Sequence, residues 1–153
     1  MDTLRAAFGF AMPDDVLEQF CCDHASKDDF QQQYGHLDLR RLSWELREIS
    51  AGELVQSTVF EGFKSWVSTV SARLQDFDNE GWSCIDLRPA VVEHWKAHRT
   101  WIRPPILLDG HLVGRGPGLH LVEGHTRLGV LAGAVKSGLV SADSIHRAWI
   151  GEC

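Results

Sequence analysis

The sequence contains no long hydrophobic run. Nothing in its 153 residues approaches the roughly 20 consecutive apolar residues that a membrane-spanning helix needs. An apolar stretch near the start, residues 6–12, is short and lacks the small-residue pattern of a signal-peptide cleavage site. We therefore expect a cytoplasmic protein that has no membrane partner.

Cysteine is scarce and its spacing shows no pairing pattern. Two of the four cysteines are adjacent and one is the last residue: Cys21, Cys22, Cys84 and Cys153. We read them as free thiols in a reducing compartment. Cys21, Cys22 and His24 lack a second ligand pair at usable spacing, so we do not expect a structural zinc site.

Basic residues are outnumbered overall, and the imbalance lies in the first half. Residues 1–80 carry 15 acidic against 7 basic side chains, a balance of −8, whereas residues 81–153 carry 6 against 8, a balance of +2. The second half also holds six of the eight histidines. Ligands that contain phosphate are therefore more plausible for the second half.

The length fits one compact domain, and its first part, residues 1–80, reads as helical. The segment after Pro13 has acidic residues in a first turn and apolar residues on one side, which predicts a short helix. Leu39, Leu42, Leu46 and Ile49 recur at helical spacing, which predicts a second helix after Asp38.

Ser50 and Glu53 form a capping-box pair that predicts the start of a long amphipathic helix. Apolar residues then follow at steps of three and four for roughly seven turns: Val59, Phe60, Phe63, Trp66, Val67, Val70, Leu74 and Phe77. We expect this stripe to be core. The alternative is a surface for a partner helix, including the seam of a homodimer through the helical half.

Residues 81–153 read as a small α/β region. The pattern predicts strands at 83–87, 106–108, 119–122 and 145–150, and helices at 91–101 and 125–136. Asp109-Gly110 predicts a turn after which residues 112–113 return as a strand, and residues 114–118 form a glycine-rich loop. We expect an α+β fold in which the helical N-terminal half packs on this region as one unit.

The most informative segment is the passage from strand to helix at residues 119–128. Gly124 at the joint lets the backbone turn sharply and lets a ligand approach the amides. The first amides of a helix have no partner within it, and the helix dipole is positive there, so an anion fits. The turn therefore predicts a phosphate-binding site.

The side chains around Gly124 suit that chemistry. Arg127 lies in the first turn, where its forked guanidinium can hold a phosphate or carboxylate in two bonds, and Thr126 adds a hydroxyl. Glu123 at the strand end can hold a metal ion or act as a general base. The alternative is an ordinary strand-to-helix turn in which Arg127 pairs with a structural carboxylate.

Gly129 and Gly133 form a Gly-x-x-x-Gly pattern inside the same helix. Each costs roughly 1 kcal/mol of helix stability relative to alanine. We expect a close backbone contact at this helix face as the compensation.

Three motifs together resemble the ParB/sulfiredoxin superfamily: Ile85-Asp86-Leu87, then Pro105-Ile106-Leu107-Leu108, then Val122-Glu123-Gly124-His125-Thr126-Arg127-Leu128. The resemblance covers roughly residues 83–150 and implies a small ParB/sulfiredoxin-like α/β domain with a Gly-x-x-Arg turn that opens a helix. It implies binding of ATP, ADP or CTP phosphates at Gly124, His125, Thr126 and Arg127.

The turn is most similar to the Asp-Gly-His-His-Arg turn of ParB-like free serine kinases. His125 replaces the nucleophilic cysteine of sulfiredoxins, so sulfinic acid reduction is not expected. No helix-turn-helix region follows the domain here, so DNA binding as in chromosome-partitioning members is not expected either. The resemblance implies phosphoryl transfer or nucleotide hydrolysis, with Glu123 and His125 as catalytic residues and Mg²⁺ beside Glu123. The alternatives are a non-catalytic module that binds a nucleotide, nucleic acid or protein, and a ParB-like nuclease.

Other candidates are weaker. His94 and His98 have the i, i+4 spacing of metal ligands, without an evident third ligand. With their basic neighbours they could instead form a rim over a phosphate, but a solvated helix face is the expected reading. His111 and His120 flank the predicted hairpin and could reach the same site. The loop 114–118 lacks the Lys-Ser/Thr of a P-loop and would serve equally well as a mobile lid.

Overall fold

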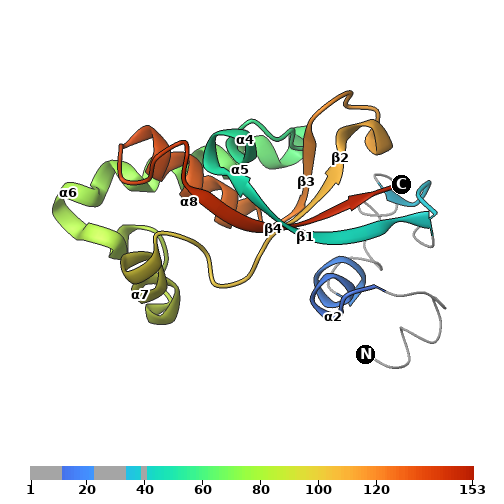
Figure 1. Cartoon of the computed structure of the whole chain (residues 1–153). Coiled ribbons are helices and arrows are strands. Elements are labelled where there is room, and N and C mark those ends of the chain that lie inside the picture. Colours follow the sequence, from blue (N-terminus) through green and yellow to red (C-terminus); the bar gives the residue numbers. More distant parts are fainter. Residues whose placement is uncertain (1–11, 23–33, 39–40) are drawn as a thin grey trace.

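A four-stranded mixed sheet forms the centre of the protein (Figure 1). The structure, a computed structural model, describes residues 12–22, 34–38 and 41–153. The strands β1 (Ser43–Ser50), β2 (Ile106–Asp109), β3 (Leu119–Glu123) and β4 (Ile145–Glu152) lie in the order β1-β4-β2-β3. β4 pairs antiparallel with β1 and parallel with β2, and β2 pairs antiparallel with β3. The α+β class is confirmed.

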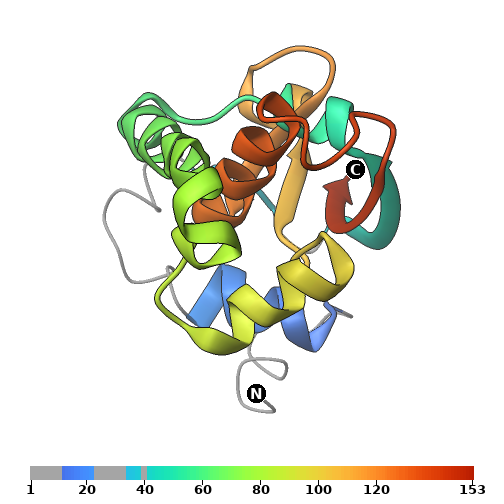
Figure 2. The ribbon, with the colours of Figure 1, turned by 90° about the vertical axis from the view of Figure 1, so that its left-hand side faces the viewer.

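Helices cover both faces of this sheet. One face carries α4 (Ala51–Val55), α5 (Glu61–Ala72) and α8 (His125–Lys136), and Figure 2 shows α8 between α5 and the sheet. The other face carries α2 (Asp14–Val16), which continues into η1 (Leu17–Cys22). The remaining helical elements are η3 (Arg73–Asp76), α6 (Phe77–Glu80), η4 (Gly81–Cys84), α7 (Pro89–His98) and η5 (Gly110–Val113). No helix of the described residues is both long enough and apolar enough to cross a membrane.

Two hydrophobic clusters form on the two sides of the sheet, because adjacent strand residues point to opposite faces. Leu107 and Leu121 join the larger cluster with residues of α4, α5 and α8. Ile106 and Leu108 join the smaller one, which contains Val16 of α2. The two sequence halves therefore share one sheet, and both contribute to each of the two clusters.

The helix predicted after Asp38 is wrong, because Ser43–Ser50 is strand β1. All eight of its residues pair with β4, about a hundred positions later in the chain. Leu42 and Ile49 are both buried, but in the clusters on opposite sides of the sheet, so they do not share the single face that the helical spacing predicted. The pairing with a distant strand decides between helix and strand. Leu39 lies outside the described residues.

The predicted seven-turn helix is interrupted. Ser50 caps α4 as predicted, since its hydroxyl accepts a hydrogen bond from the Glu53 amide, but α4 ends at Val55. Thr58 then pairs with β3: its amide donates to the Leu119 carbonyl and its carbonyl accepts from the Leu121 amide, each at 2.9 Å. The edge of β3 thus binds the Thr58 amide and carbonyl, which a continuous helix would need for its own hydrogen bonds.

The strand predicted at 83–87 is also wrong. Residues 81–84 are the short helix η4, and Ile85 is fully buried. Its carbonyl accepts a hydrogen bond from the Arg73 guanidinium at 2.9 Å instead of joining a strand. Residues 112–113 likewise belong to η5 rather than to a returning strand. The strands at 106–108, 119–122 and 145–150, the helices at 91–101 and 125–136, and the loop at 114–118 are confirmed, with shifts of a few residues at some ends.

The expected close contact at the Gly-x-x-x-Gly face is confirmed. A Cβ atom built on Gly129 would lie 2.8 Å from Val70 Cβ, and one built on Gly133 would lie 2.8 Å from Leu74 Cδ2 and even closer to the Ser71 carbonyl oxygen. The two glycines let the α8 backbone lie directly on α5.

We expect Gly133→Ala to lower the free energy of unfolding by up to about 2 kcal/mol, since overpacking costs about 1–3 kcal/mol and the gain in helix propensity returns about 1. Urea unfolding measures the change. The matched control is Gly62→Ala in α5, where a Cβ meets nothing within 4 Å, and we expect that variant to be as stable as the wild type or more stable. Equal effects of the two substitutions would contradict this account.

Candidate functional site

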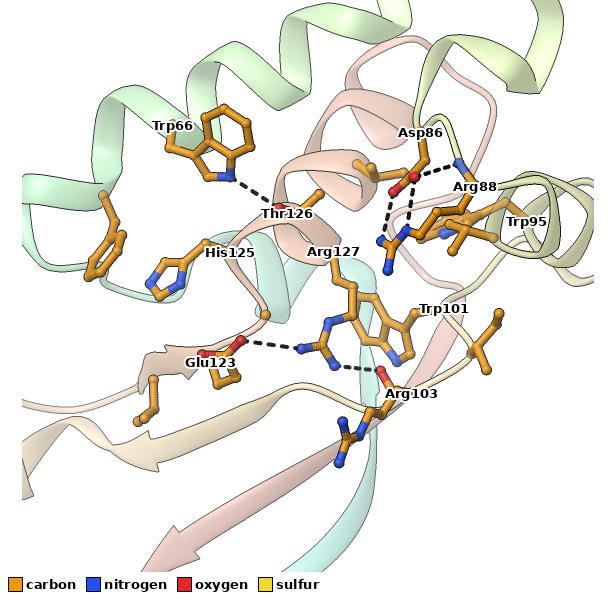
Figure 3. A pocket seen from close by; sticks show the side chains of 16 residues that line it. Trp66, Asp86, Arg88, Trp95, Trp101, Arg103, Glu123, His125, Thr126 and Arg127 are labelled. Atoms are coloured by element: carbon orange, nitrogen blue, oxygen red, sulfur yellow. Dashed lines mark hydrogen bonds and ion pairs between the residues drawn. The ribbon is translucent and has the colours of Figure 1, made fainter. Parts of the chain in front are cut away.

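A pocket of about 910 Å³ lies at the start of α8 (Figure 3). The whole turn Glu123-Gly124-His125-Thr126-Arg127 borders it, as do α5, the start of α7 and the segment that leads into β2. The other lining residues are Phe63, Trp66, Asp86, Arg88, Val91, Trp95, Trp101, Ile102, Arg103, Val122 and Val130.

The turn itself has the predicted geometry. Gly124 has φ +109°, a conformation that favours glycine, and a Cβ there would lie 2.6 Å from Pro105 Cβ and 3.2 Å from Arg127 Nε. Its carbonyl accepts the first helical bond from Leu128, at 2.9 Å. Gly124, the N-cap residue, has no side chain with which to cap α8, and the positive end of the helix dipole borders the pocket.

Arg127 crosses the middle of the pocket and is held by protein groups. Its Nη1 donates to the Arg103 carbonyl at 2.9 Å, and its Nη2 donates to Gln19 Oε1 at 3.0 Å. The same Nη2 lies 3.8 Å from Glu123 Oε1. Burial lowers the pKa of this guanidinium, and 23% of the side chain remains exposed. Arg127 therefore joins three segments and presents only an edge to a ligand.

Glu123 points into the pocket beside Arg127 (Figure 3). A quarter of its side chain is exposed. In the described part of the chain no three histidine, cysteine, aspartate or glutamate side chains gather around a potential metal position. A metal ion at Glu123 would therefore need its other ligands from a substrate and from water.

His125 and Thr126 contact α5. The His125 ring stacks on Phe63 at a centroid distance of 4.1 Å, with 23° between the planes. The Thr126 hydroxyl accepts a hydrogen bond from Trp66 Nε1 at 3.0 Å. His125 thus has its ring at the α5 wall, and the Thr126 hydroxyl can still donate one bond.

The opposite wall carries a local ion pair. Arg88 donates to Asp86 through its amide, Nε and Nη2, at 2.8–3.0 Å. These hydrogen bonds hold the pKa of the Asp86 carboxyl below its usual range. The Arg88 side chain is 72% exposed, whereas that of Asp86 is only 12% exposed.

The charged lining side chains nearly balance. Three arginines, Arg88, Arg103 and Arg127, face two carboxylates, Asp86 and Glu123, which leaves +1 with histidine neutral. Arg103 in addition pairs with Asp15 and Glu18 of the α2–η1 segment. The pocket is thus a mixed-charge site.

Sequence reasoning placed Phe63 and Trp66 in the core, and this is wrong: they are 39% and 43% exposed. It also missed Arg88 and assigned Asp86 to a strand. The helical spacing of Phe63 and Trp66 shows that they share a helix face with the core residues. It does not show that this face continues past the end of the helix that covers it. Pro89, a common first helical residue, was the available signal for the other wall, because Asp86 and Arg88 stand just before it in the sequence.

The remaining candidates lie away from the pocket lining. The rings of His94 and His98 on α7 are 4.6 Å apart, and His111 pairs with Asp109 at 3.0 Å. His120 is fully buried, with Nδ1 2.7 Å from the Thr58 hydroxyl and Nε2 3.4 Å from the Tyr34 hydroxyl. His24 and the side chains of Cys21 and Cys22 lie outside the described residues.

Comparisons with protein-family models, with curated proteins and with solved structures find no match to this chain. The resemblance to the ParB/sulfiredoxin superfamily therefore gains no support from relatives and stays a prediction.

His120 should make the stability depend on pH. Burial, with a smaller contribution from the charge of Arg115, lowers its pKa from 6.5 to about 4. Between pH 6.5 and 4 this histidine is protonated in the unfolded chain but stays neutral in the folded protein. The contribution of His120 to the free energy of unfolding, at most about 3 kcal/mol, is therefore present above pH 6.5 and lost as the pH falls towards 4.

We expect the difference in unfolding free energy between the wild type and His120→Asn to shrink from pH 7 to pH 4.5, as measured by urea unfolding. Leu87→Ala is the control, because that side chain is fully exposed and carries no titrating group, and its difference should stay constant. A constant difference for His120→Asn would contradict the assignment.

Proposed function

We propose that the pocket binds a nucleoside phosphate together with Mg²⁺. The observation that carries the proposal is the division of the pocket into two ends. Figure 3 shows Trp66 on the α5 side and Arg88 on the α7 side, with Arg127 between them. Trp95 and Trp101 lie on the α7 side as well, but they are buried, so the exposed aromatic side chains are those of α5. An end with exposed aromatic rings and an end with exposed cations match a ligand that joins a flat base to phosphates.

The phosphates belong in the cationic part. The N-terminus of α8 supplies the dipole, and α7 begins at Pro89, directly after Arg88, so a second helix N-terminus borders the same space. Arg88 is the most exposed of the three lining arginines, at 72% against 39% for Arg103 and 23% for Arg127, so a phosphate can reach its guanidinium. Arg127 adds the exposed edge of its guanidinium.

Mg²⁺ suits the mixed charge. This ion is usually held by one or two carboxylates with substrate phosphates and water completing an octahedron. Glu123 supports such a role as the pocket carboxylate at the end of β3, next to the first turn of α8. When bound there, the ion would neutralise phosphate charge and polarise a phosphoryl oxygen.

Phosphoryl transfer or hydrolysis is the activity that these residues would support. Glu123 would hold the ion or take the proton from an attacking hydroxyl or water, the terminal phosphoryl group would pass to that oxygen, and the shortened nucleotide would leave. The ring of His125, fixed against Phe63, would lie next to the same phosphates. Arg127 would position Glu123 and stabilise charge on the transferred group. Specific binding without chemistry is the second candidate, favoured by the fact that Arg127 is already bonded to protein groups.

We expect Mg²⁺ and ATP, ADP or CTP to raise the melting temperature, and Arg88→Ala to weaken nucleotide binding roughly tenfold or more, since a charged hydrogen bond is worth about 1.5–3 kcal/mol. Isothermal titration calorimetry measures the affinities. Lys136→Ala, an exposed cation at the far end of α8, is the control and should bind like the wild type. No stabilisation by any nucleotide would refute the proposal, and equal binding of DNA or heparin with steep salt dependence would favour a nucleic-acid surface.

Glu123→Gln separates binding from chemistry. We expect it to remove the Mg²⁺ dependence of nucleotide affinity, because the carboxylate that holds the ion becomes a neutral amide of similar size. Release of inorganic phosphate should stop while nucleotide binding remains. The matched control is Glu93→Gln on α7, which lies outside the pocket lining. Unchanged release in Glu123→Gln would remove Glu123 from the catalytic role, and absence of release from the wild type would leave the binding function.

A further inference from the structure

Two aromatic side chains of α5 stand exposed at the mouth of the pocket. Phe63 and Trp66 lie one helical turn apart and are 39% and 43% exposed, whereas Val70, one turn further along the same helix, is fully buried. Both line the pocket. Exposed aromatic side chains grouped at a cavity usually mark a binding surface.

The Trp66 indole is held rigidly despite its exposure. Its Nε1 donates to the Thr126 hydroxyl at 3.0 Å, and the Arg73 guanidinium lies 5.3 Å from the ring centroid. Arg73 is itself fixed by its hydrogen bond to the Ile85 carbonyl. A ring that is ordered before a ligand arrives loses little entropy on binding, which favours stacking affinity.

We infer that Trp66 is the stacking platform for the nucleobase, with Phe63 at its side, and that the base lies at the α5 end while the phosphates extend across the start of α8 towards Arg88. The inference rests on the proposed function and deepens it by assigning the orientation and the recognition of the base. Phe63 is the lesser platform because the His125 ring, which also lines the pocket, stacks on it at 4.1 Å. Arg73 lies over the Trp66 ring but is not part of the pocket lining.

Stacking on a tryptophan selects ligands that carry a flat base. Every base has a flat face, so a platform accepts all four bases, and preference follows stacking strength rather than hydrogen-bond pattern. Purines offer two fused rings and stack over a larger area. ATP and GTP should therefore bind more tightly than CTP and UTP.

The experiment compares Mg²⁺–ATP with Mg²⁺–tripolyphosphate, which carries the phosphates without a base, by calorimetry on the full chain. Trp66→Ala should weaken ATP binding roughly 5- to 150-fold and leave tripolyphosphate binding unchanged. Trp66→Phe keeps a ring but loses the bond to Thr126, and it should weaken ATP binding by less. The control is Leu87→Ala, a fully exposed side chain that is not in the pocket lining.

The outcomes separate the two claims. If neither ligand binds the wild type, the proposed function fails. If both bind but Trp66→Ala weakens them equally or not at all, phosphate binding by the pocket stands and the stacking role is refuted. A wild-type dimer that dissociates on Trp66→Ala would also overturn it, because a second copy would then cover the indole. Urea unfolding confirms that each variant is folded, and Trp66→Phe keeps the test open if Trp66→Ala is unstable.

Discussion

The direct packing of the α8 backbone on α5 is the contact on which the rest of the structure depends. Gly129 and Gly133 remove the side chains that would hold the two helices apart. The close approach closes the larger hydrophobic cluster over the sheet. It also sets Trp66 against Thr126 and Phe63 against His125, so the first turn of α8 meets two aromatic rings of α5. One packing contact thus supports the core and shapes one wall of the pocket.

The charged side chains of the pocket already have protein partners before any ligand arrives. Arg88 is bonded to Asp86, Arg103 to Asp15 and Glu18, and Arg127 to two neutral oxygen atoms with Glu123 close by. An anion would therefore exchange existing contacts for new ones, so its net gain would be smaller than that of a phosphate entering a site of unpaired arginines. Such a site suits a ligand that brings its own cation and a second, apolar source of affinity.

Local patterns predicted the second half of the chain better than the first. The end of β3, the glycine at the joint and the extent of α8 follow from local patterns: an apolar strand, a positive φ that favours glycine, and apolar residues at helical spacing up to Lys136. Residues 43–50 were misread because their structure depends on pairing with β4, and residues 85–87 because a side chain of η3 supplies the partner for the Ile85 carbonyl. Long-range partners do not appear in a local pattern.

The candidate site divides in the same way. The sequence by itself determined the strand-to-helix turn and its members Glu123, Gly124, His125, Thr126 and Arg127, because a tight turn, a helix N-terminus and a forked cation are properties of neighbouring residues. Only the tertiary structure decided that most of the Arg127 guanidinium bonds to protein groups. It also decided that Asp86 and Arg88 form the opposite wall and that Trp66 faces the pocket rather than the core. The physical reason is that burial depends on what packs against a residue. For Trp66 the partner helix is α8, which begins at His125, so only its first turn contacts the indole and the ring stays partly exposed.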